Sequence, residues 1–498
     1  MKKSRLHKDI EKYLSQGISP LHMPGHKRTL APDQGLPYEW DVTEVEGLDD
    51  LHAAGGILRK AMERTAALCG ADRSFYLVNG STAGNLAGVF AMVKRGDEII
   101  MARNCHRSLF HIVQLLGLRV HWLLPPMVEG YAIPGAIRPQ DVAKALSQHP
   151  ASRAIILTSP TYEGVVSDIA AIAALAHEQG VPLLVDEAHG AHFGLFMESG
   201  FPDSAIHQGA DLSVQSYHKT LPSLTQTAVL HLKSRLIDEI KLQQGLAIFE
   251  TSSPSYPLLV SLDACTEYLL EKGAEAFRRW RKNLEAFDQE IASLQYVKVL
   301  CHGKETDADY GFFGYDSSKI LINAKDAGLT GPALQDVLRN TYQLETEMTM
   351  GDNVLAMTGP VEESAALQHL TQALCHIDDK GKELAEANGN REVAPSTADG
   401  FSAQPLSVQE SLLSTLPEPV LSIAEALEQE ASPLSFSSAA GHICHEYVYC
   451  YPPGIPLLIP GERIRQETIH WLVEMEKRGS SLRYTESADN AGTISCIK

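Results

Sequence analysis

The sequence has few basic residues for its acidic content, and it has no long apolar run. Its 498 residues include 42 Lys and Arg against 62 Asp and Glu, which gives a formal net charge of −20. Nucleic acids and anionic membranes bind basic surfaces, so this balance argues against both as partners. No stretch reaches the roughly 18 consecutive apolar residues of a membrane-spanning helix. The N-terminal residues also lack the apolar core of a secretory signal.

Cysteines are few and scattered. The eight cysteines form no Cys-x-x-Cys pair and have no regular spacing, so we expect neither a disulfide framework nor a zinc cluster. A reducing cytoplasm is the simplest compartment for such a chain. His22 and His26 have the spacing of metal ligands on a helix, but Pro24 and Gly25 lie between them and disfavour a helix there. We therefore expect no metal site.

Short apolar runs alternate with helical patterns between about residues 55 and 295. The runs Arg153–Thr158 and Val181–Asp186, for example, are separated by a helical pattern over Ile169–Gln179. Continuous apolar strands that alternate with helices predict an α/β domain with a buried, mainly parallel sheet. The pattern predicts further helices and strands at Ile57–Cys69, Ser74–Val78, Ala83–Lys94, Glu98–Ala102 and Ser108–Leu116.

The order of elements changes after this region. Residues 296–377 predict a smaller α/β domain, and residues 378–435 are rich in Ser, Glu and Pro, as in a partly flexible linker. A compact C-terminal domain is expected over 436–498. It contains a Pro- and Gly-rich stretch at 451–461 that predicts a rigid loop. Residues 1–54 form an N-terminal segment before the large domain at 55–295.

A turn of small residues stands between a predicted strand and a predicted helix. It reads Asn79-Gly80-Ser81-Thr82-Ala83-Gly84-Asn85. Small residues let a phosphate approach the backbone, hydroxyls donate hydrogen bonds, and the start of a helix is electropositive. A helix N-cap with a tight turn has the same composition, so both interpretations stay open on this motif alone.

An acidic residue, Asp186, ends the buried run that begins at Val181. Ligands of α/β folds bind at the carboxyl ends of strands, and a carboxylate there can pair with a protonated ring nitrogen. Ala188 is small enough for a flat ring to lie against it, and His189 can reach a substituent of that ring. An acid that only caps a neighbouring helix remains the alternative.

A lysine follows the next predicted strand, in Ser216-Tyr217-His218-Lys219. Its amine can condense with an aldehyde, although an isolated lysine is usually a surface residue. The combination is more informative than the lysine alone. A phosphate turn, the flat ring of His106, Asp186 and this lysine together supply what a pyridoxal phosphate site requires.

With these motifs the chain resembles the bacterial ornithine/lysine/arginine decarboxylases, in the short form that lacks an N-terminal wing domain. Asp-Glu-Ala-His is shared by other enzymes of the same fold, but Ser-x-His-Lys together with Tyr-Pro-Pro-Gly-Ile-Pro is more specific. Residues 378–435 match the family poorly. The resemblance is carried by His22–Lys27, Leu48–His52, Asn79–Gly84, Asn104–His106, Pro160–Tyr162, Asp186–Gly190, Ser216–Lys219, Thr251–Tyr256 and Tyr451–Glu462.

The resemblance implies the aspartate-aminotransferase-like type I fold of pyridoxal phosphate enzymes. It also implies a role for each matching residue. Lys219 would hold the cofactor covalently, Asp186 would hold its ring nitrogen, and His106 would stack on the ring. His218 would contact cofactor or substrate. Other cofactor contacts would come from Gly80, Ser81, Thr82, Ala188, His189 and Ser216, with Ser252 or Ser253 reaching the phosphate from a partner subunit.

The implied activity is decarboxylation of arginine, lysine or ornithine to the corresponding polyamine-type amine, in homodimers or larger homo-oligomers with shared sites. For the cationic side chain of the substrate we name Glu347, whose alternative is a solvated acid at a strand edge. Two other functions stay open. One is a transferase that joins an amino acid to an acyl-CoA. The other is a non-catalytic member of the fold, although such a member normally loses the lysine or the aspartate.

Overall fold

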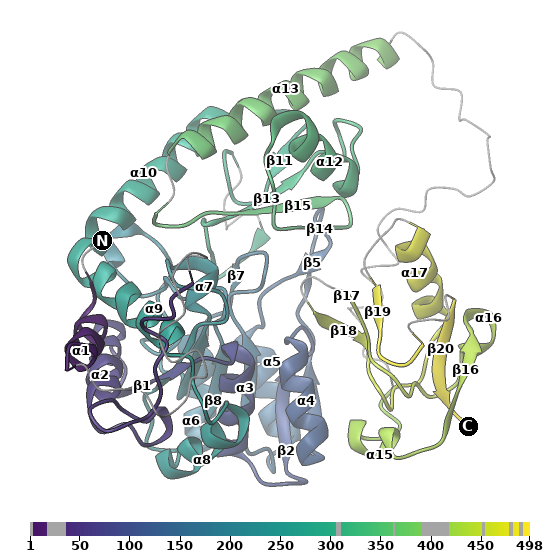
Figure 1. Cartoon of the computed structure of the whole chain (residues 1–498). Coiled ribbons are helices and arrows are strands. Elements are labelled where there is room, and N and C mark those ends of the chain that lie inside the picture. The colour runs from purple at the N-terminus through teal and green to yellow at the C-terminus, as the bar shows by residue number, and fades with distance from the viewer. Residues whose placement is uncertain are drawn as a thin grey trace. The chain divides into compact units, whose positions relative to one another are not determined.

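The computed structural model describes residues 3–16, 36–304, 310–361, 364–389, 418–450, 454–477, 482–487 and 492–498 (Figure 1). His22–Lys27 and residues 390–417 of the expected linker lie outside these residues. The chain divides into two compact units. Unit 1 comprises Met1–Ile100, Leu146–Ser159 and Ile169–Arg279, and unit 2 comprises Met101–Ala145, Pro160–Asp168 and Trp280–Lys498. The boundaries expected from the sequence stay predictions.

The sheet of unit 1 has a parallel middle and an antiparallel edge. Strands β6, β8 and β9 run parallel, with Thr158 opposite Asp186 and Leu184 opposite Leu212. Strands β10 and β1 continue the sheet in the antiparallel sense. The prediction of an α/β domain with a buried parallel sheet is confirmed. The strands span Ile155–Thr158 (β6), Leu183–Asp186 (β8), Leu212–Gln215 (β9), Ala228–Leu232 (β10) and Arg73–Leu77 (β1).

The helices of unit 1 begin close to the positions that the sequence predicts. Helix α3 lies so close to the sheet that a Cβ on Gly84 would be 2.7 Å from Leu77 Cδ1 and 2.8 Å from Val214 Cγ1. Only glycine allows this approach, which explains the small residues in the motif. The helices of this unit include α1 (Arg5–Leu14), α2 (Ile57–Cys69), α3 (Gly80–Met92), α6 (Ile169–Glu178), α7 (Tyr217–Thr220), α8 (Glu239–Phe249) and α9 (Tyr256–Tyr268).

Unit 2 contains the small antiparallel sheet that the sequence places after residue 296. Its strands follow the order β11-β13-β15-β14, and helix α12 (Gly331–Tyr342) packs against β14 and β15 (Figure 1). Helix α13 (Ser364–Gly389) extends twelve residues beyond 377 into the expected linker, because Lys, Glu, Leu and Ala favour helix there. The strands are Lys298–Val299 (β11), Lys319–Asn323 (β13), Met348–Met350 (β14) and Asn353–Met357 (β15).

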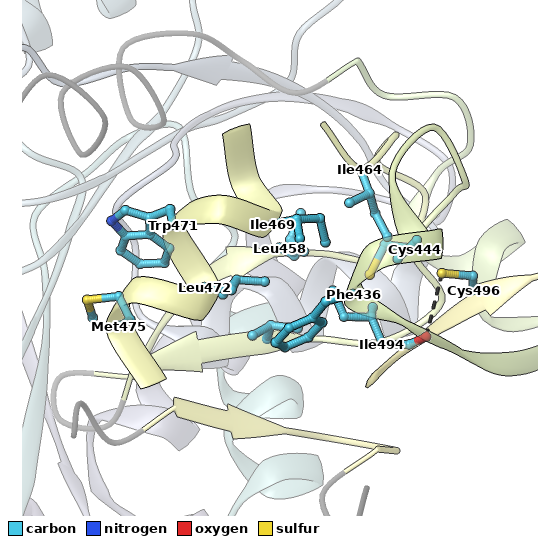
Figure 2. Close-up of a cluster of buried hydrophobic side chains, with 12 residues drawn as sticks. Phe436, Cys444, Leu458, Ile464, Ile469, Trp471, Leu472, Met475, Ile494 and Cys496 are labelled. Carbon is cyan, nitrogen blue, oxygen red and sulfur yellow. Dashed lines mark hydrogen bonds between the residues drawn. The ribbon is translucent and has the colours of Figure 1, made fainter. Parts of the chain in front are cut away.

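The last part of unit 2, the described residues from 418 to 498, is here called the C-terminal region. It has an apolar core of its own. Strand β17 (Val448–Cys450) pairs with β18 (Ile455–Leu458) and β19 (Leu482–Tyr484), and β16 (Ala431–Ser435) pairs with β20 (Thr493–Ile497). Figure 2 shows Trp471 and Leu472 of α17 (Gln466–Lys477) facing the same cluster as Phe436 and Ile494. The burial of these side chains stabilises the region.

Candidate active site

Asp186 lies at the carboxyl end of β8 and is buried. Its Oδ2 accepts a hydrogen bond from Asn85 Nδ2 at 2.8 Å, and its Oδ1 accepts one from the Ala188 N–H at 3.1 Å. Burial raises the pKa of the Asp186 carboxyl, while the positive charge of Lys219 and these two hydrogen bonds act in the opposite direction. A buried carboxylate of this kind favours a cationic group beside it.

Asn85 is a site residue that the sequence analysis did not single out. It lies on α3 and is fully buried, between the apolar or small residues of that helix. A buried amide needs hydrogen-bond partners, so a lone Asn within an apolar helix was the available signal. Its contact with Asp186 connects the turn at the start of α3 to the end of β8.

Lys219 lies on α7, directly after β9. Its Nζ is 2.8 Å from Nε2 of His189, which is buried and follows β8 by three residues. The strands β8 and β9 are parallel neighbours, so their carboxyl ends meet at one edge of the sheet and bring these residues together. The structure thus places Lys219 against His189, with Asp186 at the adjacent strand end, and the roles of the three residues stay predictions.

His218 is half-buried beside Lys219 and has a fixed ring. Its Nδ1 donates a hydrogen bond to the carbonyl oxygen of Thr227 at 2.8 Å. Burial and the nearby Lys219 lower the pKa of this histidine, while the bond to the carbonyl raises it. A neutral ring that donates through Nδ1 leaves Nε2 as a hydrogen-bond acceptor.

Helix α3 begins within the turn of small residues, at Gly80, and its N-cap side chain makes no hydrogen bond to its first N–H groups. Gly80 has a φ of +73°, a left-handed conformation that glycine adopts without strain. Asn79 does not cap the helix, because its Oδ1 accepts from the Thr251 N–H at 3.2 Å instead. Ser81 is half-buried and Thr82 is exposed on the first turn of the helix. Asn79 therefore occupies the N-cap position without a side-chain capping bond, and both interpretations of the motif stay open.

The Ser216 hydroxyl is fully buried and has no hydrogen-bond partner among the residues that the structure describes. Buried hydroxyls normally have such a partner, so a ligand oxygen at this position would satisfy it. Together with Lys219, Asp186, the buried Ala188 and the uncapped start of α3, this hydroxyl fits the aldehyde, ring and phosphate of pyridoxal phosphate.

Two of the expected site residues belong to unit 2. His106 is the N-cap of α4 (Arg107–Leu116), with Nδ1 3.3 Å from the Ser108 N–H and 2.9 Å from Ser108 Oγ. Glu347 precedes β14 and is exposed, and its carboxylate accepts a hydrogen bond from the Tyr162 hydroxyl. The roles of His106 and Glu347 stay predictions.

Ser252 and Ser253 belong to unit 1 and are exposed. The bond between the Thr251 N–H and Asn79 Oδ1 places the start of this Ser-Ser segment beside the turn before α3 in the same chain. Their contribution to a partner's site also stays a prediction.

Comparisons with known proteins place similar sequences among decarboxylases. A family model described as "Orn/Lys/Arg decarboxylase, major domain" matches residues 5–313, and one for the C-terminal domain of these enzymes matches residues 406–482. An arginine decarboxylase of Bacillus subtilis is 30% identical over 475 residues, which cover 94% of this chain and 92% of that protein.

More distant relatives share the fold. The lysine decarboxylase LdcA of Pseudomonas aeruginosa is 24% identical over 494 residues, which cover 83% of this chain and 66% of that protein. The solved structure of a Francisella novicida lysine decarboxylase superimposes with a TM-score of 0.81 at 20% identity. That superposition covers 100% of this chain and 81% of the other. Among the described residues, no helix has the length and apolar character needed to cross a bilayer.

Proposed function

The chain belongs to the Orn/Lys/Arg decarboxylase family, and on that premise we propose that it decarboxylates a basic amino acid with pyridoxal phosphate as cofactor. The substrate would be arginine, lysine or ornithine, and the products CO₂ and the corresponding amine. The observation that carries this proposal is the contact of Lys219 with His189 beside the buried Asp186 at one sheet edge. These are the groups that such a cofactor needs from a protein.

Pyridoxal phosphate, when bound, accepts the electron pair that the departing carboxylate leaves on Cα of the substrate. Asp186 would hold a proton on the ring nitrogen through a charge-assisted hydrogen bond, and Asn85 Nδ2 would hold Asp186 in place. Ser216 Oγ and the first N–H groups of α3 would bind the phosphate.

Lys219 would anchor the cofactor covalently and release it when the substrate amine takes its place. His189 Nε2, 2.8 Å from the amine, is positioned to exchange a hydrogen bond or a proton with Lys219 Nζ. His218, whose Nδ1 is occupied by the Thr227 carbonyl, would offer Nε2 to cofactor or substrate. Each of these side chains is fixed by a contact within the chain, so the site is preorganised.

A substrate panel tests the proposed reaction. Purified protein saturated with pyridoxal phosphate is incubated with arginine, lysine, ornithine, glutamate or aspartate, and CO₂ and amine products are measured. We expect release from at least one basic amino acid and little from the acidic ones. Faster release from glutamate or aspartate would overturn the substrate class. Release that requires an acyl-CoA would instead identify a transferase, and no turnover with any substrate would favour a non-catalytic member of the fold.

We propose Glu347 as the partner of the substrate's cationic side chain. Glu347 is an exposed carboxylate that accepts a hydrogen bond from the Tyr162 hydroxyl, and the cationic side chain of a bound substrate would need such a carboxylate as its partner. Glu347→Gln should raise KM for the basic substrate more than it lowers kcat. Glu345→Gln is the matched control, because Glu345 is two residues away, exposed and paired with Arg339 at 3.1 Å. Equal kinetics for both variants would make Glu347 an ordinary surface acid.

We further propose a homodimer or larger homo-oligomer with shared sites, in which Ser252 or Ser253 reaches the partner's phosphate. Both serines are exposed, and so are Ile240 (68%) and Ile248 (61%) on the preceding helix α8. Mixing Lys219→Ala subunits with Ser252→Ala/Ser253→Ala subunits should restore part of the activity. If labelled subunits exchange and no activity returns, each site is self-contained.

We also propose that the protein acts in the cytoplasm in polyamine metabolism. None of the cysteines whose side chains are described forms a disulfide, which suits a reducing compartment, and the expected products are of the polyamine type. Cell fractionation and amine levels in a deletion strain test both statements.

A further inference from the structure

Unit 2 contains a contact between its C-terminal region and the segment that carries His106. The Arg107 N–H donates a hydrogen bond to the Gly454 carbonyl oxygen at 3.1 Å, across almost 350 residues of sequence. Two arginines, Arg103 and Arg107, flank His106 and extend this contact. Neither arginine is part of the chemistry proposed above.

The first arginine, Arg103, is buried, with 5% of its side chain exposed. Its Nη1 donates to the Pro456 carbonyl oxygen at 2.5 Å, and its Nη2 donates to the Leu457 carbonyl oxygen at 3.1 Å. Nη2 also lies 3.3 Å from each carboxylate oxygen of Glu462, whose side chain is 2% exposed. A buried ion pair of this kind depends on its geometry, because the loss of either partner leaves an unpaired buried charge.

The surroundings of Arg103 restrict it further. Its guanidinium carbon lies 5.4 Å from the Phe110 ring and 5.5 Å from the Trp122 ring, and those two rings are stacked. Glu462 in turn accepts the Ile459 N–H at 3.1 Å. The guanidinium group is thus held by aromatic rings on one segment and by carbonyl and carboxylate oxygens on the other.

The second arginine makes a smaller contact with the same region. Arg107 Nη1 donates to the Tyr449 hydroxyl at 3.0 Å, and its guanidinium carbon lies 5.3 Å from the Tyr449 ring. His106 lies between the two arginines and caps α4 through the Ser108 N–H. Residues of the C-terminal region thus bind the Arg103 side chain on one side of His106 and the backbone N–H and side chain of Arg107 on the other.

We propose that Arg103 and Glu462 are positioning residues, through which the C-terminal region holds His106 in place for its contact with the cofactor. This inference rests on the proposed function and on the contact of His106 with the cofactor ring that the family resemblance implies. It gives the C-terminal region a part in catalysis without any contact of its own with the substrate. A displacement of a site group by about 1 Å can cost 10²-fold in rate, so loss of the pair should be visible in kcat.

The test uses the full-length holoenzyme and removes both charges at once, so that no charge is left unpaired. Arg103→Met/Glu462→Met should lower kcat by about 10²-fold with a smaller change in KM, and should alter the visible circular dichroism of the bound cofactor. Arg463→Met is the matched control, because Arg463 forms an exposed pair with Glu418 in the same region at 3.0 Å. The control should change neither property.

A double-mutant cycle separates positioning from general stability. His106→Ala should lower kcat much less in the Arg103→Met/Glu462→Met protein than in the wild type, because His106 is already displaced there. If the effects of the two sets of substitutions on the free energy of activation are additive instead, the proposal is wrong. Arg103→Lys, which keeps the charge without the planar fork of donors, provides a milder variant if the double variant fails to fold.

Hydrogen exchange gives a readout that does not depend on activity. The Ser108 amide, held by His106 Nδ1, should exchange faster in the Arg103→Met/Glu462→Met protein than in the Arg463→Met control. Unchanged exchange at Ser108 would overturn the positioning role, whatever the kinetics show. If the wild type shows no decarboxylation but this exchange difference appears, the proposed function fails while the anchoring of His106 stands.

Discussion

The sheet edge of unit 1 and the C-terminal region of unit 2 both bury a carboxylate, but they satisfy it differently. Glu446 is fully buried and accepts four hydrogen bonds, from the Glu486, Ser487 and Ser495 N–H groups and from the Ser487 hydroxyl. Asp186 accepts two among the residues described here. Near it, the buried Ser216 hydroxyl has no partner among the described residues.

This difference distinguishes a structural carboxylate from one that is available to a ligand. A carboxylate has about four lone-pair sites, and Glu446 uses them to tie the 486–487 loop to β20. Asp186 keeps acceptor capacity at the carboxyl end of a parallel strand, where α/β folds bind ligands. Substitutions at the sheet edge should therefore lower the decarboxylation rate, and substitutions at Glu446 should lower the free energy of unfolding.

The largest expected effect is that of Lys219→Ala. Removal of the amine should lower decarboxylation by on the order of 10⁴-fold, because both cofactor anchorage and proton exchange with His189 are lost. After borohydride reduction, intact-protein mass spectrometry should find the cofactor attached to the wild type and not to the variant. Lys233→Ala, at an exposed lysine after β10, is the control and should retain both properties. Stoichiometric labelling of the Lys219→Ala protein would show that another residue is the anchor.

Asp186→Ala is expected to follow, with the loss of most of the rate and little loss of stability. The variant removes a buried carboxylate whose desolvation is unfavourable, but it also leaves the Asn85 amide without its acceptor, and because these two changes oppose each other thermal unfolding should shift little. Asp186→Glu should be intermediate in rate. Asn85→Ala should cost roughly tenfold in kcat/KM, as expected for one hydrogen bond to a charged group. A near-normal rate for Asp186→Ala would remove this carboxylate from the mechanism.

Glu446→Gln should show the opposite pattern. An amide can accept at only one of its two terminal atoms, so donors that now bind the carboxylate lose their acceptor. We expect a loss of about 2–4 kcal/mol in the free energy of unfolding. Turnover by the folded protein should be unchanged. Equal stability of the variant and the wild type, measured by urea unfolding, would contradict the structural role of Glu446.

Local patterns in the sequence were sufficient to predict one side of this comparison, the sheet edge of unit 1. Apolar runs followed by Asp186 and Lys219 identify two parallel strand ends, and Lys219 Nζ lies 2.8 Å from Nε2 of His189, three residues after Asp186. Asn85 was missed because helical periodicity does not show which buried residue will lie opposite a strand end. The pairing of Arg103 with Glu462 joins positions 359 residues apart, and no local pattern links them. Such contacts depend on tertiary packing, which propensity and spacing do not encode.

The smallest expected effect concerns Glu187, which lies next to Asp186. Its carboxylate is surrounded by hydrogen-bond donors of the protein, as that of Glu446 is. It accepts from the Ala205 N–H, the Ser213 hydroxyl and Gln215 Nε2 at 2.7–2.8 Å. Burial raises the pKa of Glu187 to about 7, although these hydrogen bonds oppose the shift. The folded protein then keeps a proton that the unfolded chain loses near pH 4.5, so stability falls as pH rises from about 4.5 to 7 and is constant above.

Glu187→Gln removes this titration. The wild type should therefore lose roughly 2–3 kcal/mol relative to the variant between pH 5 and 8, measured as the difference between their urea unfolding free energies. Glu63→Gln, at an exposed glutamate paired with Arg59, is the control and should follow the wild type. Taking the difference between the curves cancels the contribution of Glu250, whose pKa burial also raises to about 7. Parallel curves for the wild type and Glu187→Gln would mean that Glu187 stays ionised in the folded protein, in which case its three donors, rather than its burial, determine its charge.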